Sequence, residues 1–279
     1  MTAPHFSRYV AIGDSSTEGL DDPLGPSAPG RYRGWADRFA AHVARARAAA
    51  LPGASPLLYA NLAIRGRKTC EILDEQLAPA LAMRPDLATV FGGTNDIIRR
   101  GFSLDAVIAD IRTMQRAFRD AGATVLTITM PDLSEVMPLA KRAAPKLHAF
   151  NAAVREVSRE TGTIVVDLAA YPFVTDPRFW SGDRLHANSE GHARIAAALA
   201  HALGLPHVDG SWAEPLPHRA PPSALRRVAM ELQWTREHFI PWAWRHVRGR
   251  SSGDGISAKH PQLTPVTAPD TDAPLLPRP

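Results

Sequence analysis

Up to about Leu205, the chain alternates between two patterns of apolar and polar residues. Short apolar runs predict buried strands, and between them apolar residues recur three or four apart, as on one face of a helix. The predicted strands cover residues 8–14, 56–64, 87–93, 123–130 and 163–168. The predicted helices cover residues 34–50, 104–122, 146–162 and 188–204. This alternation predicts an α/β fold whose parallel sheet of five strands is covered by helices on both faces.

In a parallel sheet of this kind, ligands bind beyond the carboxyl ends of the strands. Residues that directly follow a predicted strand are therefore candidates for chemistry. They are Ser15, residues 65–68, residues 94–96 and the loop after Asp167.

The first predicted strand ends within the sequence "YVAIGDSSTEGL", residues 9–20. Its Ser15 would stand at the carboxyl edge of the sheet, where a serine hydroxyl becomes a nucleophile if a base removes its proton. A Gly-Asp-Ser tripeptide is also typical of turns and helix caps. The assignment of Ser15 therefore depends on finding the base.

The candidate base is His186, one of 11 histidines, within the sequence "SGDRLHANSEGH". Asp183 precedes it by three residues, and in a turn this spacing brings a carboxylate beside the imidazole, where it fixes the tautomer. An Asp–His ion pair in a solvated loop fits the same residues. His192 is expected on the following helix, at its surface or in local packing. A metal site of Asp183, His186 and His192 would leave Ser15 without a role.

Acyl transfer also needs hydrogen-bond donors for the oxyanion that develops on the substrate. Gly66, in "NLAIRGRKT", has no side chain, so its backbone N–H can face a site; Asn95, in "FGGTND", can donate from its amide. Both residues also fit ordinary turns. Because every one of these motifs follows or flanks a predicted strand end, we expect them to meet at one edge of the sheet.

Four sequence blocks in this order, "IGDSSTEG", "NLAIRGRKT", "GGTND" and "DRLHANSEGH", resemble those of the SGNH (GDSL-type) hydrolase family, over about residues 8–204. The resemblance implies a three-layer, flavodoxin-like fold with five parallel strands. It implies Ser15 as nucleophile, His186 as base and Asp183 as its orienting partner. The implied oxyanion donors are the Ser15 N–H, the Gly66 N–H and the Asn95 side chain. Ala187 departs from the family, in which proline often follows the histidine.

The expected activity is hydrolysis of a small-molecule or lipid ester through an acyl-enzyme, with no metal or cofactor. An acyltransferase or a thioesterase of the same fold is the alternative. The expected wall of the acyl pocket is the segment after the fourth strand, residues 130–145. Its candidate pocket residues are Met130, Leu133, Val136 and Met137. The same side chains could also serve only to pack the loops.

The predicted division of the chain has four parts: a hydrolase domain (1–205), a proline-rich linker (206–222), a basic, tryptophan-bearing helical extension (223–250) and a disordered tail (251–279). A basic helix with tryptophans can lie on an anionic membrane surface or bind a partner. It can equally dock its aromatic residues onto the hydrolase domain. No nucleic-acid-reading motif accompanies the arginines, so nucleic-acid binding is not expected.

The overall composition changes this picture little. The chain is 45% hydrophobic and 22% charged, with a net charge of +4, as expected for a globular protein. A single cysteine, Cys70, excludes an intrachain disulfide. The N-terminus lacks the apolar core of a signal peptide, and no apolar run is long enough to span a membrane. A cytoplasmic location is therefore expected.

Overall fold

A twisted six-stranded sheet forms the centre of the protein in the computed structural model, which describes residues 5–26, 28–99, 101–135, 137–219, 223–241, 244 and 252–266. The strands lie in the order β5-β4-β3-β1-β2-β6. Their bounds are β1 Arg8–Gly13, β2 Leu58–Asn61, β3 Leu87–Phe91, β4 Thr124–Ile128, β5 Ile164–Val166 and β6 His260–Pro265. Strands β1 to β5 are parallel, and β6 is antiparallel to β2.

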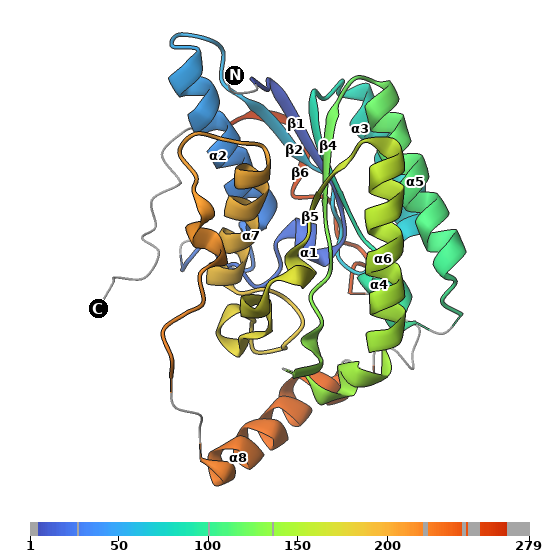
Figure 1. Cartoon of the computed structure of the whole chain (residues 1–279), viewed down its shortest axis with the longest axis vertical. Coiled ribbons are helices and arrows are strands. Elements are labelled where there is room, and N and C mark those ends of the chain that lie inside the picture. The colour runs from blue at the N-terminus through green and yellow to red at the C-terminus, as the bar shows by residue number, and fades with distance from the viewer. Residues whose placement is uncertain are drawn as a thin grey trace.

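Helices cover both faces of the sheet and complete three layers (Figure 1). One layer holds α2 (Gly34–Ala50) and α7 (Ser189–Ala202), and the opposite layer holds α3 (Thr69–Ala82), α5 (Leu104–Asp120) and α6 (Ala144–Thr161). Burial on both faces explains why the strands read as nearly continuous apolar runs: every residue of β3 is buried,. The predicted α/β fold with its parallel sheet is confirmed.

The strand order places a topological switch at the carboxyl edge of the sheet. Strand β1 pairs with β2 on one side and with β3 on the other, and the chain crosses to opposite faces after these strands, which opens a crevice there. Two short helices begin at this edge, α1 (Ser15–Glu18) after β1 and α4 (Thr94–Ile98) after β3. The fold therefore brings the first and third sequence blocks together.

The prediction of five strands is wrong by one, because β6 comes from the segment for which the sequence predicts disorder. His260–Pro265 pairs with β2 from Leu58↔Pro265 to Asn61↔His260. It covers an edge strand that would otherwise present unpaired backbone groups. All of its residues are exposed or half-buried, and the segment lacks the alternation of apolar residues that identifies a strand in sequence. Lys259, just before it, forms a 2.8 Å ion pair with Asp37 of α2.

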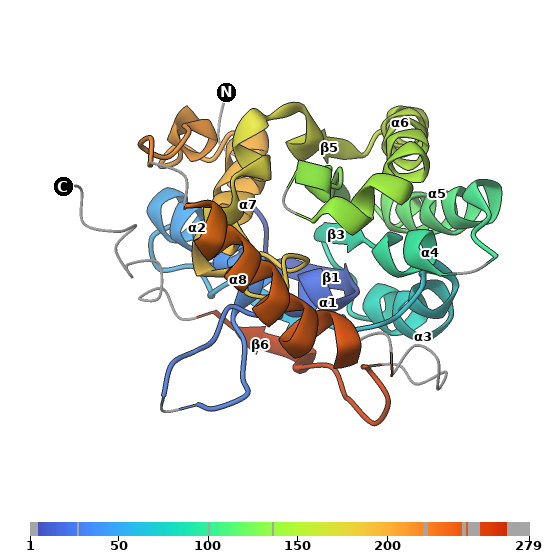
Figure 2. The same ribbon diagram turned by 90° about the horizontal axis from the view of Figure 1, so that it is seen from below.

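The segment for which the sequence predicts a helical extension contains α8 (Ala224–Trp234), and the Ser223 side chain caps this helix by accepting from the Arg226 N–H. A π-helical turn, Thr235–Phe239, continues it. The segment lies across the carboxyl edge of the sheet, below it in Figure 1 and in front of it in Figure 2. Within the predicted linker, Trp212 is buried against Tyr171. Among the described residues, no helix is long and apolar enough to cross a bilayer.

Candidate active site

Ser15 stands at the carboxyl end of β1, as the sequence predicts, because the chain turns there directly from strand to helix. Gly13 permits a close approach to β3, since a Cβ at this position would lie 2.5 Å from the Phe91 oxygen. Asp14 then caps α1, and its Oδ1 accepts a 3.1 Å hydrogen bond from the Ser16 N–H. The adjacent serines face different partners: the Ser16 Oγ accepts from the Trp35 indole at 3.2 Å.

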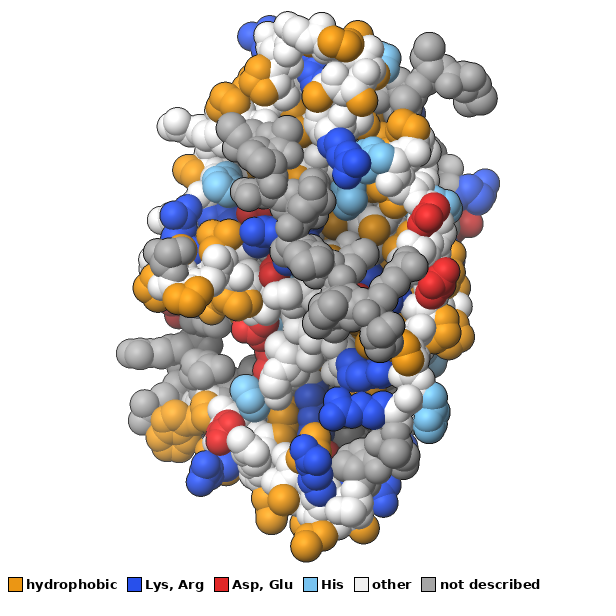
Figure 3. Space-filling view, turned by 90° about the vertical axis from the view of Figure 1, so that its left-hand side faces the viewer, with side chains coloured by type: hydrophobic (Ala, Val, Ile, Leu, Met, Phe, Trp, Pro, Cys, Tyr) orange, Lys and Arg blue, Asp and Glu red, His pale blue; other side chains and the backbone are white. Residues whose placement is uncertain are grey.

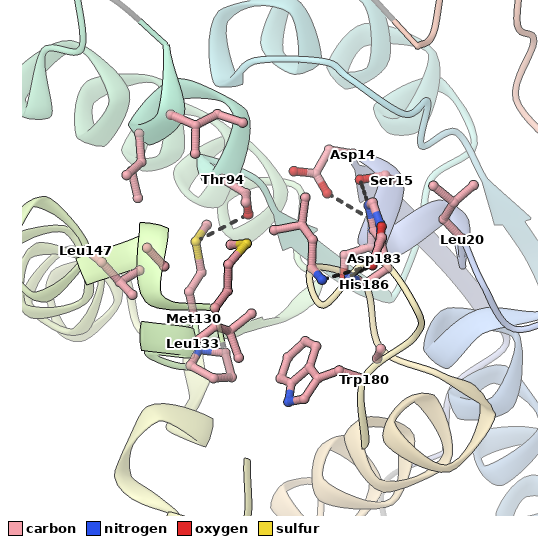
Figure 4. Close-up of a pocket in the computed structure, with 18 of the residues that line it drawn as sticks. Asp14, Ser15, Leu20, Thr94, Met130, Leu133, Leu147, Trp180, Asp183 and His186 are labelled. Carbon is pink, nitrogen blue, oxygen red and sulfur yellow. Dashed lines mark hydrogen bonds and ion pairs between the residues drawn. The ribbon is translucent and has the colours of Figure 1, made fainter. Parts of the chain in front are cut away.

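A continuous chain of hydrogen bonds joins Ser15, His186 and Asp183 (Figure 4). The Ser15 Oγ lies 2.8 Å from His186 Nε2, and His186 Nδ1 lies 2.6 Å from Asp183 Oδ2. An ionised carboxylate can only accept, so Nδ1 carries a proton and, in the neutral imidazole, Nε2 is the acceptor for the serine hydroxyl. The predicted nucleophile and base, 171 positions apart in sequence, are thus in direct contact.

The loop that carries Asp183 holds its carboxylate in place. Asp183 Oδ1 accepts from the backbone N–H of Leu185 at 2.9 Å and of His186 at 3.0 Å. This turn requires a left-handed conformation at Arg184, with φ of 61°. Burial alone would raise the pKa of Asp183, but the hydrogen bond and charge of His186 outweigh it and hold that pKa well below its usual value.

Asp21 is a further carboxylate beside these residues, and no sequence motif marks it as a site residue. The Ser181 hydroxyl lies 2.6 Å from Asp21 Oδ2 and 2.6 Å from Asp183 Oδ1; with one proton it can donate to one of them at a time. Burial would lower the pKa of His186, but Asp183, followed by the charges of Asp21 and Asp14, raises it above its usual value. His186 therefore lies in a field of three carboxylates.

The three predicted oxyanion donors line the same cavity as His186. Gly66 has φ of 77°, in the left-handed region that favours glycine,. The Asn95 Nδ2 donates to the Arg67 oxygen at 3.0 Å and lies 3.4 Å from Asp14 Oδ2. The loops after β2 and β3 are thus joined by the Asn95 side chain, which holds its amide at the serine edge of the cavity.

Asp14 and Asp96 both accept hydrogen bonds from backbone N–H groups of neighbouring residues, which supports a structural role for them. Asp96 Oδ2 accepts from the Thr69 N–H at 3.1 Å and so fixes the start of α3. Asp14 is buried, with 1% of its surface exposed. Burial raises the pKa of Asp14 to about 7.

His192 is buried rather than at the helix surface, and it packs α7 against α2 and the Leu20 loop. Its Nδ1 accepts from the Trp35 N–H at 3.0 Å, and its Nε2 lies 3.0 Å from the Leu20 oxygen. Both ring nitrogens are therefore used in backbone hydrogen bonds, and His192 does not join His186. Among the described residues, the potential metal ligands whose ligand atoms lie within 4.8 Å of one another are Asp21, Asp183 and His186.

A cavity of about 830 Å³ opens beside the serine. Three of the four predicted pocket residues line it, namely Met130, Leu133 and Met137; Val136 lies outside the described residues. Figure 4 shows Ser15 and His186 on one side of the pocket and Met130, Leu133 and Leu147 on the other. The loop at residues 171–180 supplies another wall through Phe173, Val174, Phe179 and Trp180. The walls are mainly apolar, but charged side chains besides Asp14 and Asp183, among them Asp132, Lys146 and Arg194, also line the cavity.

The helical extension also lines this cavity, through Trp234, Glu237, His238, Phe239 and Pro241. It is attached to the loop that carries Asp183, because the Trp234 indole donates to the backbone oxygen of Asp183 at 3.1 Å. Arg184 forms a 2.8 Å ion pair with Glu231, and its guanidinium lies over the Trp234 ring, 5.1 Å from the centroid. These contacts agree with the interpretation in which the extension docks its aromatic residues onto the domain.

Comparisons with known proteins identify one family. The profile of the GDSL-like Lipase/Acylhydrolase family matches residues 11–194. The acetylxylan esterase Axe2 of Geobacillus stearothermophilus is 19% identical, with a TM-score of 0.56 over 75% of this chain and 100% of its own. TesA is 20% identical, with a TM-score of 0.51 over 71% of this chain and 98% of its own. Among curated proteins, none matches the sequence.

A further solved structure, the acetyl xylan esterase AlAXEase, is 17% identical, with a TM-score of 0.54. The alignment covers 70% of this chain and 98% of that one. At these identities the structures show a shared fold. The alignments cover the solved structures almost completely, whereas a quarter or more of this chain has no counterpart in them. The family profile likewise ends at residue 194, before α8.

Proposed function

Since the chain belongs to the GDSL-like Lipase/Acylhydrolase family, we propose that it hydrolyses carboxylic esters through a Ser15–His186–Asp183 triad. The observation that carries this proposal is the 2.8 Å contact between Ser15 Oγ and His186 Nε2, with Asp183 bonded to the opposite ring nitrogen. A serine, a base that contacts it and an acid that orients the base are the parts needed for nucleophilic catalysis.

In the proposed reaction His186 accepts the Ser15 proton as the Oγ attacks the ester carbonyl. The backbone N–H groups of Ser15 and Gly66 and the Asn95 amide stabilise the oxyanion. The imidazolium, held by Asp183, then protonates the leaving alcohol and an acyl-Ser15 remains. Water, deprotonated by His186, attacks this ester in the second step; the acid leaves and the serine recovers its proton.

We further propose that the acyl group is larger than acetyl. The two acetylxylan esterases among the similar structures act on acetyl groups of xylan by name, but at 17–19% identity they do not fix the substrate of this chain. The 830 Å³ cavity is lined beyond the serine by Met130, Leu133 and Met137, and apolar walls of this size suit an acyl chain. An acetyl group would leave most of these walls without contact.

Hydrolysis of p-nitrophenyl esters from acetate to palmitate tests both parts of the proposal. The adjacent serines offer a matched pair of variants, Ser15→Ala and Ser16→Ala. We expect Ser15→Ala to lose activity by about 10³-fold or more, and Ser16→Ala to retain most of it. A fluorophosphonate should modify Ser15, as located by peptide mass spectrometry. Activity that survives Ser15→Ala refutes the nucleophile, and an optimum at acetate refutes the larger acyl group.

A further inference from the structure

The helical extension carries an unusual concentration of exposed apolar side chains. Among the described residues, all large apolar side chains that are more than 40% exposed lie between Leu225 and Trp244. They are Leu225 (82%), Val228 (58%), Met230 (46%), Leu232 (68%), Ile240 (56%) and Trp244 (59%). No residue of α8 is buried. The cost of exposing this much apolar surface suggests that something covers it.

Three of the exposed apolar residues lie on one face of α8. Leu225, Val228 and Leu232 are spaced three and four apart, so they form a stripe along the helix, which we call the outer stripe. Trp234 lies on the opposite face, where its indole donates to the backbone oxygen of Asp183. Glu231 lies to the side of the stripe and pairs with Arg184. The attachment of α8 to the catalytic loop therefore fixes the direction in which the outer stripe points, away from the cavity.

Basic side chains accompany the outer stripe. Arg226, Arg227 and Arg236 are exposed, and the sequence adds Arg245, Arg248 and Arg250 directly afterwards. Figure 3 shows hydrophobic and basic side chains side by side at the lower end of the molecule, where α8 lies in Figure 1. Exposed apolar residues together with exposed arginines on a short helix are the composition that binds in the interface of an anionic membrane.

We propose that the outer stripe, with Arg226, Arg227 and Arg236, binds the surface of an anionic lipid bilayer. The inner face of the same segment lines the cavity through Trp234 and His238. A bilayer seated on the outer stripe would therefore be separated from the cavity by this helical segment alone.

A second copy of this chain is a less suitable occupant of the outer stripe than a bilayer. Pairing of two such helices would bring their arginines together, because Arg226 and Arg227 lie within the same turn as Leu225 and Val228, and like charges repel. Lipid phosphates instead neutralise them. The helix is also tied to the domain by the contacts of Trp234 and Glu231 with residues 183–184.

Co-sedimentation of the full chain with vesicles tests the proposal without reference to catalysis. The vesicles are phosphatidylcholine alone, or equal parts phosphatidylcholine and phosphatidylglycerol, at low and high salt. We expect binding to the anionic vesicles at least about tenfold stronger than to the neutral ones, and weakened by salt. Arg226→Glu with Arg227→Glu should reduce it by about fivefold or more for each residue.

The matched apolar variants are Leu225→Ser/Val228→Ser/Leu232→Ser on the outer stripe and Leu24→Ser/Leu51→Ser/Ile256→Ser elsewhere on the surface. We expect the first to lose binding by about tenfold or more and the second to bind as the wild type does, with circular dichroism confirming that both fold. The proposal is overturned if the wild type stays in the supernatant with anionic vesicles, if both triple variants bind equally, or if the stripe variant dissolves a concentration-dependent dimer and leaves vesicle binding unchanged.

Discussion

The Trp234 indole donates a 3.1 Å hydrogen bond to the backbone oxygen of Asp183. Trp234 lies 40 residues beyond the end of the family profile, at residue 194, yet it bonds to the residue that orients His186. Arg184 adds an ion pair to Glu231 and a cation–π contact to the same indole. The extension is therefore part of the structure that positions the proposed catalytic acid.

Trp234→Phe removes this hydrogen bond and keeps an aromatic ring under Arg184. Because a hydrogen bond of this kind contributes about 0.5–1.5 kcal/mol, we expect kcat on p-nitrophenyl acetate to fall about two- to tenfold. KM should change less, since the small ester does not depend on the Trp234 wall. Gln233→Ala, an exposed neighbour, is the control and should have wild-type kinetics. Equal kcat values in the two variants would show that the bond does not support catalysis.

Asp21→Asn should move the acid limb of the pH–activity profile to lower pH. His186 accepts a proton only when neutral, so activity rises as pH increases through its pKa. Asp183, Asp21 and Asp14 raise that pKa, and removing the Asp21 charge returns it toward the usual value. We expect the midpoint of kcat/KM to fall by about 0.5–1 pH unit.

The control for charge alone is Asp105→Asn, an exposed position in the first turn of α5. Its midpoint should equal that of the wild type. In Asp21→Asn the new side-chain amide can still bond to Ser181, so a loss of activity at all pH values would indicate a structural role for Asp21. An unchanged or higher midpoint in Asp21→Asn would contradict the electrostatic role of Asp21.

Asp14→Asn should stabilise the protein at alkaline pH. Burial raises the pKa of Asp14 from 3.8 to about 7 in the folded state, so the unfolded chain releases this proton at a lower pH than the folded protein does. The wild type therefore loses stability as pH rises between these two values and does not regain it above them. Asparagine has no proton to lose and caps a helix equally well.

Urea unfolding at about pH 4 and about pH 8 measures the effect. We expect the free energy of unfolding of Asp14→Asn to exceed that of the wild type by about 1–4 kcal/mol at the higher pH, and by much less at the lower one. Asp105→Asn, with its exposed carboxylate, should show no such pH-dependent gain. A variant that is equally destabilised at both pH values would mean that Asp14 is ionised in the folded protein.

The sequence predicts most of the sheet from local patterns, and it predicts the contact between Ser15 and His186 from their places after strand ends and from the family resemblance. Apolar runs identify the strands that are buried on both faces, and parallel strands bring their carboxyl ends to one edge. Helix α3 is not among the predicted helices, although Ile72, Gln76 and Ala80 form its buried face. Pro79 within it and the buried glutamine interrupt the apolar period, so the pattern is weak.

Features that depend on distant partners could not be predicted. Strand β6 exists because β2 offers an open edge, not because of its own composition,. Asp21 acquires its role through Ser181, 160 residues away, and Trp234 through Asp183, 51 residues away. In each case the sequence contains no spacing that joins the two partners.

Leu133→Trp should shorten the acyl chain that the enzyme prefers. Leu133 is 8% exposed and faces the cavity across from Ser15, so an indole there would occupy space that a long acyl chain needs. Overpacking of this kind costs about 1–3 kcal/mol, and we expect kcat/KM for long-chain p-nitrophenyl esters to fall about tenfold or more. Acetate, which does not reach Leu133, should be hydrolysed within about twofold of the wild-type rate. Leu51→Trp, on the surface, is the matched control. An equal fall for acetate and long chains would place the acyl group elsewhere in the cavity.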